Sequence, residues 1–210
     1  MNSHFAPSYF LNPLHKLSVC VVGAGGTGSQ VLTCLARINS TLIALNHPGL
    51  QVTAIDDDIV SEANIGRQLF SPSDVGRHKV HVLIERINRF FGLNWEYKTT
   101  KVTSKSTLRF NIIIGCVDNI NARKLIRKNF SINHANRSDY EKSYYWLDFG
   151  NSNNSGQVIL SDDKKLNDIF DLFPGFGAQQ EDTNTPSCSV AEAISKQNLF
   201  TNSTLAQLGC

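Results

Sequence analysis

The chain has 210 residues, of which 41% are hydrophobic, and its formal net charge is +2. This length accommodates one domain with a substantial core, and the near-neutral charge argues against nucleic acid as a partner. No apolar run reaches the roughly 18 residues of a membrane span, and the N-terminus lacks the pattern of a secretory signal.

The five cysteines bear on the redox compartment and on metal content. None of them forms a CxxC pair, and their number is odd. A disulfide framework and a four-cysteine zinc site are therefore improbable. We expect a cytoplasmic protein with reduced thiols and no zinc.

Predicted strands and helices alternate along the first 130 residues. After an irregular arm (1–16), the elements are a buried strand (17–22), a glycine turn (23–28), a helix (29–39), a connector (40–50) and a second strand (51–55). A long loop (59–73), a helix capped by Ser73-Asp74, strands over 94–99 and 111–116, and a helix through Leu125 and Ile126 follow. Beyond them we predict strands over 144–149 and 156–160 and helices over 190–196 and 202–210.

This alternation predicts an α/β fold, a Rossmann-like three-layer sandwich with a mostly parallel sheet. We expect a single domain over residues 1–210, with the nucleotide-binding core at 17–130 and a partner-binding half at 131–210. No capping residue follows the last predicted helix. We therefore expect the chain to stop inside that helix and the second half to be incomplete.

A glycine-rich loop follows the first predicted strand. Gly23-Ala24-Gly25-Gly26-Thr27-Gly28 fits G-x-G-x-x-G between a strand and a helix. Such glycines allow a tight turn, close approach of a phosphate and close helix packing, and the helix N-terminus offers free N–H groups to an anion. Asp56, after the second strand, suits ribose hydroxyls. NAD, FAD and ATP all remain open from this motif, as does a packing turn that binds no ligand.

A second set of polar residues separates these possibilities. Asn64, Arg67 and Gln68 follow the second strand, and Lys79 follows them in Asp74-Val75-Gly76-Arg77-His78-Lys79-Val80. A dehydrogenase has no need of an arginine and a lysine facing the phosphates here, whereas an adenylating enzyme must stabilise the charge on departing pyrophosphate. Asp118, at the end of the fourth strand, could hold Mg²⁺.

Each of these residues has a plain structural alternative. An arginine or lysine near a loop is usually solvated. Asp118-Asn119 could cap a helix, and Asp57 and Asp58 are typical turn residues. These structural alternatives explain single residues more readily than they explain the whole set of polar residues.

The ordered motifs resemble the ThiF/MoeB/HesA family, which includes the ubiquitin-activating enzymes. They are the GAGGTG loop, the DxD strand end, N-x-x-R-Q-x-F, D-x-G-x-x-K-V and C-x-D-N, between residues 17 and 130. The segment from Ala63 to Pro72 and the connector before the second strand most resemble the ThiF proteins of PRTRC gene clusters.

The resemblance implies ATP- and Mg²⁺-dependent adenylation of the C-terminal glycine carboxylate of a small ubiquitin-like or sulfur-carrier protein, by a homodimer. It implies catalytic roles for Arg67, Lys79, Asp118 and Cys188, with Asp118 as the Mg²⁺ ligand. The implied nucleotide-binding residues are Gly23, Gly25, Gly26, Gly28, Asp56, Asp58, Asn64, Arg67, Gln68, Lys79, Asp118 and Asn119.

The chain departs from the family pattern in its zinc ligands and in its N-terminal arm. Many relatives hold zinc with two CxxC pairs, and many lend an N-terminal arginine to a neighbouring subunit. The arm at residues 1–16 contains His4, His15 and Lys16 but no arginine. These departures keep open a nucleotide-binding scaffold that has lost catalysis, beside the NAD- or FAD-dependent oxidoreductase that shares the glycine loop.

Cys188 is the candidate for a thioester-forming nucleophile. It lies in Thr185-Pro186-Ser187-Cys188-Ser189, before a predicted helix whose N-terminus would lower the thiol pKa. Ubiquitin-activating enzymes carry their cysteine in a similar P-x-C-[ST] context. A small packing or cap residue is an equally open interpretation. Cys20, Cys34 and Cys116 are expected to pack in the core.

Overall fold

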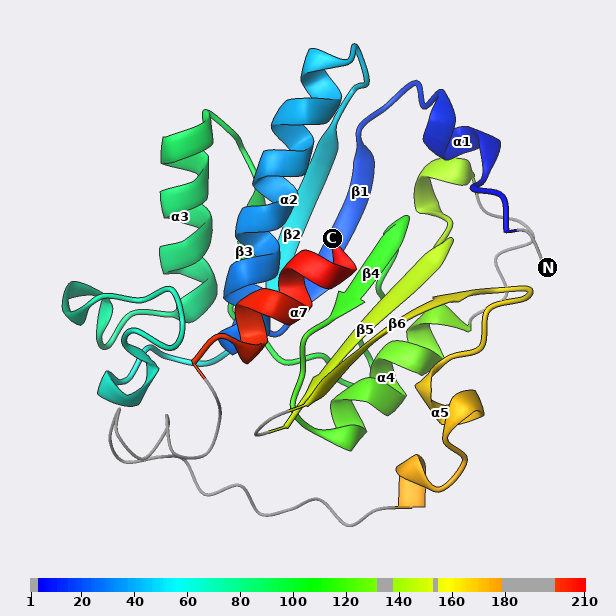
Figure 1. Ribbon diagram of the computed structural model, residues 1–210. Coiled ribbons are helices and arrows are strands. Elements are labelled where there is room, and N and C mark those ends of the chain that lie inside the picture. Colours follow the sequence, from blue (N-terminus) through cyan, green and yellow to red (C-terminus); the bar gives the residue numbers. More distant parts are fainter. Residues whose placement is uncertain (1–3, 132–137, 153–154, 179–198) are drawn as a thin grey trace.

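The computed structural model describes residues 4–131, 138–152, 155–178 and 199–210, and a six-stranded sheet forms its centre (Figure 1). The strand order is β3-β2-β1-β4-β5-β6. All neighbouring strands run parallel except the β5–β6 pair, which is antiparallel. The strands are β1 (Leu17–Val22), β2 (Leu50–Ile55), β3 (Glu96–Lys98), β4 (Ile112–Gly115), β5 (Tyr145–Asn151) and β6 (Gly156–Asp162).

Helices cover both faces of this sheet, which confirms the predicted three-layer α/β fold. α2 (Gly26–Ala44), α3 (Lys79–Phe91) and α7 (Thr201–Gly209) pack on one face, and α4 (Ile120–Phe130) packs on the other (Figure 1). None of the described helices has the length and apolar character to cross a membrane. The short helices are α1 (Ser8–Leu11), α5 (Ile169–Leu172) and the 3-10 turns η1 (Glu62–Asn64), η2 (Pro72–Asp74), η3 (Asp139–Glu141) and η4 (Phe176–Ala178).

Strand β1 lies between two separate apolar cores. Val19 and Val21 face α2 and α3, whereas Cys20 and Val22 face α4. Successive side chains of a strand point to opposite faces, so a central strand covered on both sides is apolar at nearly every position. This geometry explains why β1 appears in the sequence as an unbroken apolar run.

Helix α2 is longer than predicted at both ends. The sequence favoured a helix over 29–39, whereas α2 runs over Gly26–Ala44. At its start, Gly26, Thr27 and Gly28 already belong to the helix. Near its end, Ser40 Oγ donates to the carbonyl of Ala36 at 3.1 Å, so the hydroxyl is satisfied within the helix. The predicted connector therefore begins later than residue 40.

A further expectation, at the start of α3, was wrong. Ser73 and Asp74 do not cap α3; they belong to η2, and α3 begins at Lys79 after the N-cap residue His78. Gly76, at φ +87°, turns the chain between the two elements. Phe90 lies on the outer face of α3 and is 80% exposed.

Candidate nucleotide-binding site

The carboxyl ends of three parallel strands meet where the strand order reverses. β1 has β2 on one side and β4 on the other. The chain passes from β1 to β2 and β3 on one side, and then crosses from β3 to β4 on the other side. Open α/β sheets bind ligands at such a switch point. Gly23 follows β1, Asp56 follows β2 and Asp118 follows β4 within a few residues.

The glycines of the loop have different structural roles. Gly23 has φ +91°, and a Cβ there would lie 2.6 Å from the carbonyl oxygen of Cys116. A Cβ on Gly28 would collide with the carbonyl of Gly23, and one on Gly26 would collide with the side chain of Asn202. A Cβ on Gly25 would meet no atom within 4 Å. Packing thus requires three of the glycines, and the fourth leaves open space beside the loop.

An acidic residue and a lysine adjoin this loop. Asp56 Oδ2 accepts a hydrogen bond from the Ala24 N–H at 2.6 Å, and its Oδ1 accepts one from the Asp58 N–H at 2.7 Å. Burial raises the pKa of Asp56, although these hydrogen bonds and the charge of Lys79 offset part of the rise. Lys79 Nζ lies 2.8 Å from Asp58 Oδ2, and its side chain is 8% exposed. The structure therefore joins the loop, both predicted acids and the predicted lysine in one network.

The segment with Asn64, Arg67 and Gln68 packs beside the first turn of α2. Asn64 Oδ1 accepts from the Ser61 N–H at 2.9 Å and caps η1. Gln68 is 5% exposed, and its Oε1 has no hydrogen-bond partner within the described residues. Burial lowers the pKa of the half-buried Arg67 guanidinium. The following residue, Leu69, donates its N–H to Ser29 Oγ of α2 at 3.4 Å, which ties this segment to the glycine-loop helix.

Asp118 and Asn119 stand at the exposed end of β4. Asn119 Oδ1 accepts from the Ala122 N–H at 2.8 Å, so Asn119 caps α4. Its Nδ2 donates to Asp118 Oδ1 at 3.5 Å. The capping alternative is thus confirmed for Asn119, and the roles of both residues toward nucleotide and metal stay predictions.

Three neighbouring carboxylates follow β2. Ligand atoms of Asp56, Asp57 and Asp58 lie within 4.8 Å of one another, the one such acidic group found in the described part of the chain. Protein groups already engage each of them, including Lys101 at 3.5 Å from Asp57. Asp118 is likewise engaged, by Asn119 Nδ2, and its role as a Mg²⁺ ligand stays a prediction.

Sequence reasoning missed two polar networks behind the site. Asn202 of α7 accepts hydrogen bonds from Thr27 at 2.9 Å and from Asn151 at 2.6 Å. Arg123 of α4 lies 3.2 Å from both carboxylate oxygens of Asp148. Their partners are separated by between 25 and 175 positions, so no local pattern in the sequence could have paired them.

Three of the five cysteines pack in or against the core, and Cys210 is exposed. Burial raises the pKa of Cys20 to about 12 and that of Cys116 well above its ordinary value, as expected for neutral, buried thiols. Cys34 also packs against the core. Cys188 lies outside the described residues, and its nucleophilic role stays a prediction.

The predicted N-terminal arm lies at the opposite end of the sheet. His4 Nε2 shares a 2.8 Å hydrogen bond with the hydroxyl of Tyr145, the first residue of β5, and His4 Nδ1 lies 3.6 Å from Asp162. The candidate nucleotide site lies at the carboxyl ends of the parallel strands. His4 therefore does not take the place of the absent N-terminal arginine in the candidate site of its own chain.

Together, the strand order, the glycine loop and the acid at the end of β2 define a Rossmann-like nucleotide-binding domain. The sequence profile of the ThiF family matches residues 2–208. The chain belongs to the ThiF family.

Two curated relatives are activating enzymes of ubiquitin-like proteins. The NEDD8-activating enzyme E1 catalytic subunit of Dictyostelium discoideum is 33% identical over 117 residues, which cover 53% of this chain and 24% of that protein. Ubiquitin-like modifier-activating enzyme 5 of Culex quinquefasciatus is 27% identical over 159 residues, which cover 68% of this chain and 36% of that protein. The chain therefore matches only a part of the length of each.

Solved structures share the fold at low sequence identity. PaaA superposes with a TM-score of 0.59 at 18% identity, covering 91% of this chain and 53% of PaaA. The E. coli tRNA N6-threonylcarbamoyladenosine dehydratase TcdA gives a TM-score of 0.52 at 22% identity, covering 66% of this chain and 54% of TcdA. Both confirm the α/β architecture.

Proposed function

We propose that this chain binds ATP·Mg²⁺ at the carboxyl ends of β1, β2 and β4 and adenylates the C-terminal glycine carboxylate of a small ubiquitin-like protein. Family membership and the two curated relatives, both named as activating enzymes for such modifiers, support this substrate class. The subfamily resemblance to ThiF proteins of PRTRC gene clusters and a homodimeric state are further parts of the proposal.

The observation that carries the proposal is the network between the glycine loop and Lys79. The open face of Gly25 leaves room for phosphate oxygens beside backbone N–H groups. Asp56 lies at hydrogen-bond distance from that loop, where it can accept from ribose hydroxyls. Lys79 places a cation beside the same strand end. Binding of a triphosphate needs such a cation near the phosphates. A fold that binds a dinucleotide does not need one there.

The proposed chemistry is an in-line displacement at the α-phosphorus of ATP. A carboxylate oxygen of the glycine forms a bond to the α-phosphorus, and the bond from that phosphorus to the oxygen bridging to the β-phosphate breaks. Pyrophosphate leaves with the electron pair. No general base is needed, because the carboxylate is ionised at neutral pH. Arg67 and Lys79 stabilise charge on the departing pyrophosphate, with Asn64 and Gln68 supporting them.

The residues at the end of β4 suit Mg²⁺. Asp118 is exposed, and Mg²⁺ prefers one or two carboxylates together with phosphate oxygens and waters. Bound there, Mg²⁺ would neutralise phosphate charge. Asn119 would line the nucleotide site beside it.

Cys188 is proposed for a second step, in which its thiolate attacks the acyl carbonyl of the adenylate. A thioester forms and AMP leaves. A partner adduct that persists under non-reducing conditions and is released by a thiol would support this step. The same adduct formed by Cys188→Ala would exclude Cys188 as the nucleophile.

Gly25→Ala tests whether the open face of the loop receives the nucleotide. The added methyl group meets no protein atom, so we expect thermal stability close to wild type. It occupies the space assigned to the phosphates, so we expect the Kd for ATP·Mg²⁺ in calorimetry to rise about ten-fold, equivalent to roughly 1.4 kcal/mol.

Gly175→Ala is the matched control, because a Cβ there also meets nothing within 4 Å and Gly175 lies between α5 and η4. We expect it to retain wild-type affinity. Equal affinities for Gly25→Ala and wild type would show that the nucleotide does not lie against this loop.

A further inference from the structure

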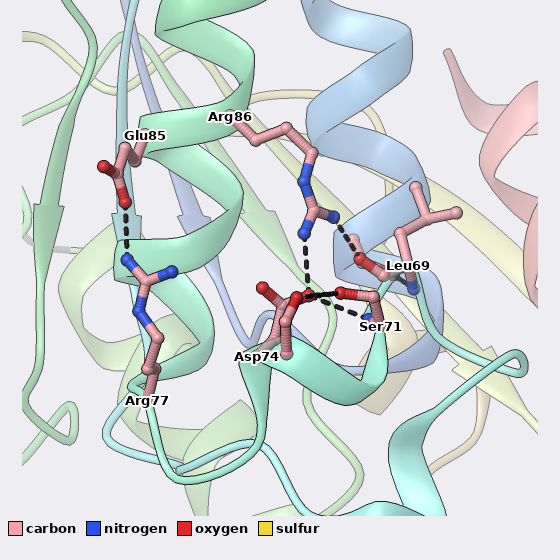
Figure 2. Close-up of polar contacts among 8 residues, drawn as sticks. Leu69, Ser71, Asp74, Arg77, Glu85 and Arg86 are labelled. Atoms are coloured by element: carbon pink, nitrogen blue, oxygen red, sulfur yellow. Dashed lines mark hydrogen bonds and ion pairs between the residues drawn. The ribbon is translucent and has the colours of Figure 1, made fainter.

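A hydrogen-bonded clamp fixes the segment that carries Arg67 and Gln68 to helix α3. Figure 2 shows Arg86 of α3 reaching toward the chain before and within η2. One guanidinium nitrogen donates to the Leu69 carbonyl at 2.7 Å, and the other donates to Asp74 Oδ2 at 2.7 Å. Two donors of one planar group therefore bind two points of the same segment.

The Asp74 carboxylate completes this clamp. Its Oδ2 also accepts from the Ser71 N–H and from Ser71 Oγ, each at 2.8 Å. Asp74 is 4% exposed. Burial would raise its pKa, but the hydrogen bonds from Ser71 and Arg86 outweigh burial and hold the pKa below its ordinary value. The Asp74 end of the clamp is therefore ionised and buried, whereas the Arg86 side chain is 47% exposed. What distinguishes the clamp from a simple surface pair is the two-point attachment of one guanidinium group.

The clamp holds Leu69 from one side while α2 holds it from the other. The Leu69 N–H donates to Ser29 of α2, and the Leu69 carbonyl accepts from Arg86 of α3. Arg67 precedes this anchored residue by two positions. Lys79 is the first residue of α3, seven positions before Arg86. The anchoring therefore connects the elements that bear the two proposed phosphate-binding cations.

We infer that Arg86 is a positioning residue for nucleotide binding, which acts by holding the Arg67 segment in register with Lys79. This inference rests on the proposed function. Without Arg86 the segment samples arrangements that do not bind ATP, and the apparent affinity falls with the fraction of competent molecules. Arg86 itself need not contact the nucleotide.

The test measures ATP·Mg²⁺ affinity by calorimetry, well below the unfolding temperature of every variant. We expect Arg86→Ala to raise the Kd about five- to ten-fold through the loss of competent molecules. Arg89→Ala is the matched control, because Arg89 lies one turn further along α3 and, within the described chain, donates no hydrogen bond to Leu69 or Asp74. We expect its Kd to equal that of the wild type.

A double-mutant cycle with Arg67→Ala distinguishes positioning from general destabilisation. If Arg86 acts through Arg67, Arg86→Ala raises the Kd less than about two-fold in the Arg67→Ala background, since coupled residues are not additive. Arg86→Lys restores the charge but not the two-point fork, so we expect it to recover only part of the affinity.

Three results would overturn the inference while leaving the proposed function intact. They are equal affinities for Arg86→Ala and Arg89→Ala, the same fold-loss from Arg86→Ala in both backgrounds, and full recovery by Arg86→Lys. Failure of the wild-type chain to bind ATP would instead overturn the proposed function, and the inference with it.

Discussion

Arg67→Ala is expected to raise the Kd for ATP·Mg²⁺ by about 10- to 100-fold. A hydrogen bond from a charged group contributes about 1.5–3 kcal/mol, and each 1.4 kcal/mol corresponds to roughly ten-fold in affinity. Arg67 is half-buried beside the glycine-loop helix. Part of the desolvation cost of its guanidinium is therefore already met in the folded protein, and phosphate oxygens would gain a preoriented partner.

The matched control for Arg67→Ala is Arg77→Ala. Arg77 is an arginine ten positions later whose side chain is 43% exposed and pairs with Glu85 at 2.6 Å (Figure 2). An exposed pair of this kind contributes little to stability. We expect Arg77→Ala to bind ATP like the wild type. If the two variants lose affinity equally, or neither does, Arg67 does not bind the triphosphate.

Arg123→Met is expected to lower the free energy of unfolding by about 3–5 kcal/mol at pH 7.5, the usual cost of leaving one partner of a buried ion pair without its counter-charge. The Arg123 and Asp148 side chains are 7% and 1% exposed. Arg123 also donates to the Phe149 carbonyl at 2.8 Å. The pair supports β4 near Asp118, since a Cβ on Gly115 would lie 3.1 Å from Asp148.

The contribution of Asp148 to the free energy of unfolding depends on pH, and the direction of its pKa shift sets the sign of that dependence. Burial raises the pKa of Asp148 to about 6, although Arg123 offsets part of the rise. The ordinary value is about 3.9, so the folded state binds more protons than the unfolded chain between about pH 4 and 6. This group's contribution to stability therefore falls as the pH rises through that window.

Without Arg123 the pKa of Asp148 should rise further, and protonation at pH 5 removes the unpaired charge. Urea unfolding should thus show a smaller deficit for Arg123→Met at pH 5 than at pH 7.5. Arg127→Met, one turn along α4, is the control, because Arg127 is 38% exposed and pairs with Asp168 and Asp171 nearer the surface. We expect it to cost about 1 kcal/mol or less. Equal losses for the two variants would contradict the buried-pair account.

The sheet and the glycine loop were predictable because their causes are local. A parallel strand buried on both faces is an apolar run such as Leu17–Val22, and the loop after it needs glycine wherever backbone approaches backbone. Gly23 and Gly28 meet that need directly. The family resemblance, confirmed over residues 2–208, rested on the same kind of ordered local motif.

The helix boundaries and the supporting polar networks were not predictable, because they depend on contacts between residues that are not neighbours in the sequence. Ser73 and Asp74 have the composition of a helix cap, but Asp74 caps its own 3-10 turn and binds Arg86. Which of two neighbouring turns a capping residue serves depends on tertiary contacts. The same holds for Asn202, whose partner Thr27 lies 175 positions away.

Calorimetric titration of the wild-type chain with ATP·Mg²⁺, and separately with NAD, tests the central claim most directly. The glycine loop and Asp56 are compatible with either ligand, whereas Arg67 and Lys79 favour a triphosphate. We predict saturable binding of ATP·Mg²⁺ and no binding of NAD. Binding of NAD, or of neither nucleotide, would contradict the assignment of this site to ATP-dependent adenylation.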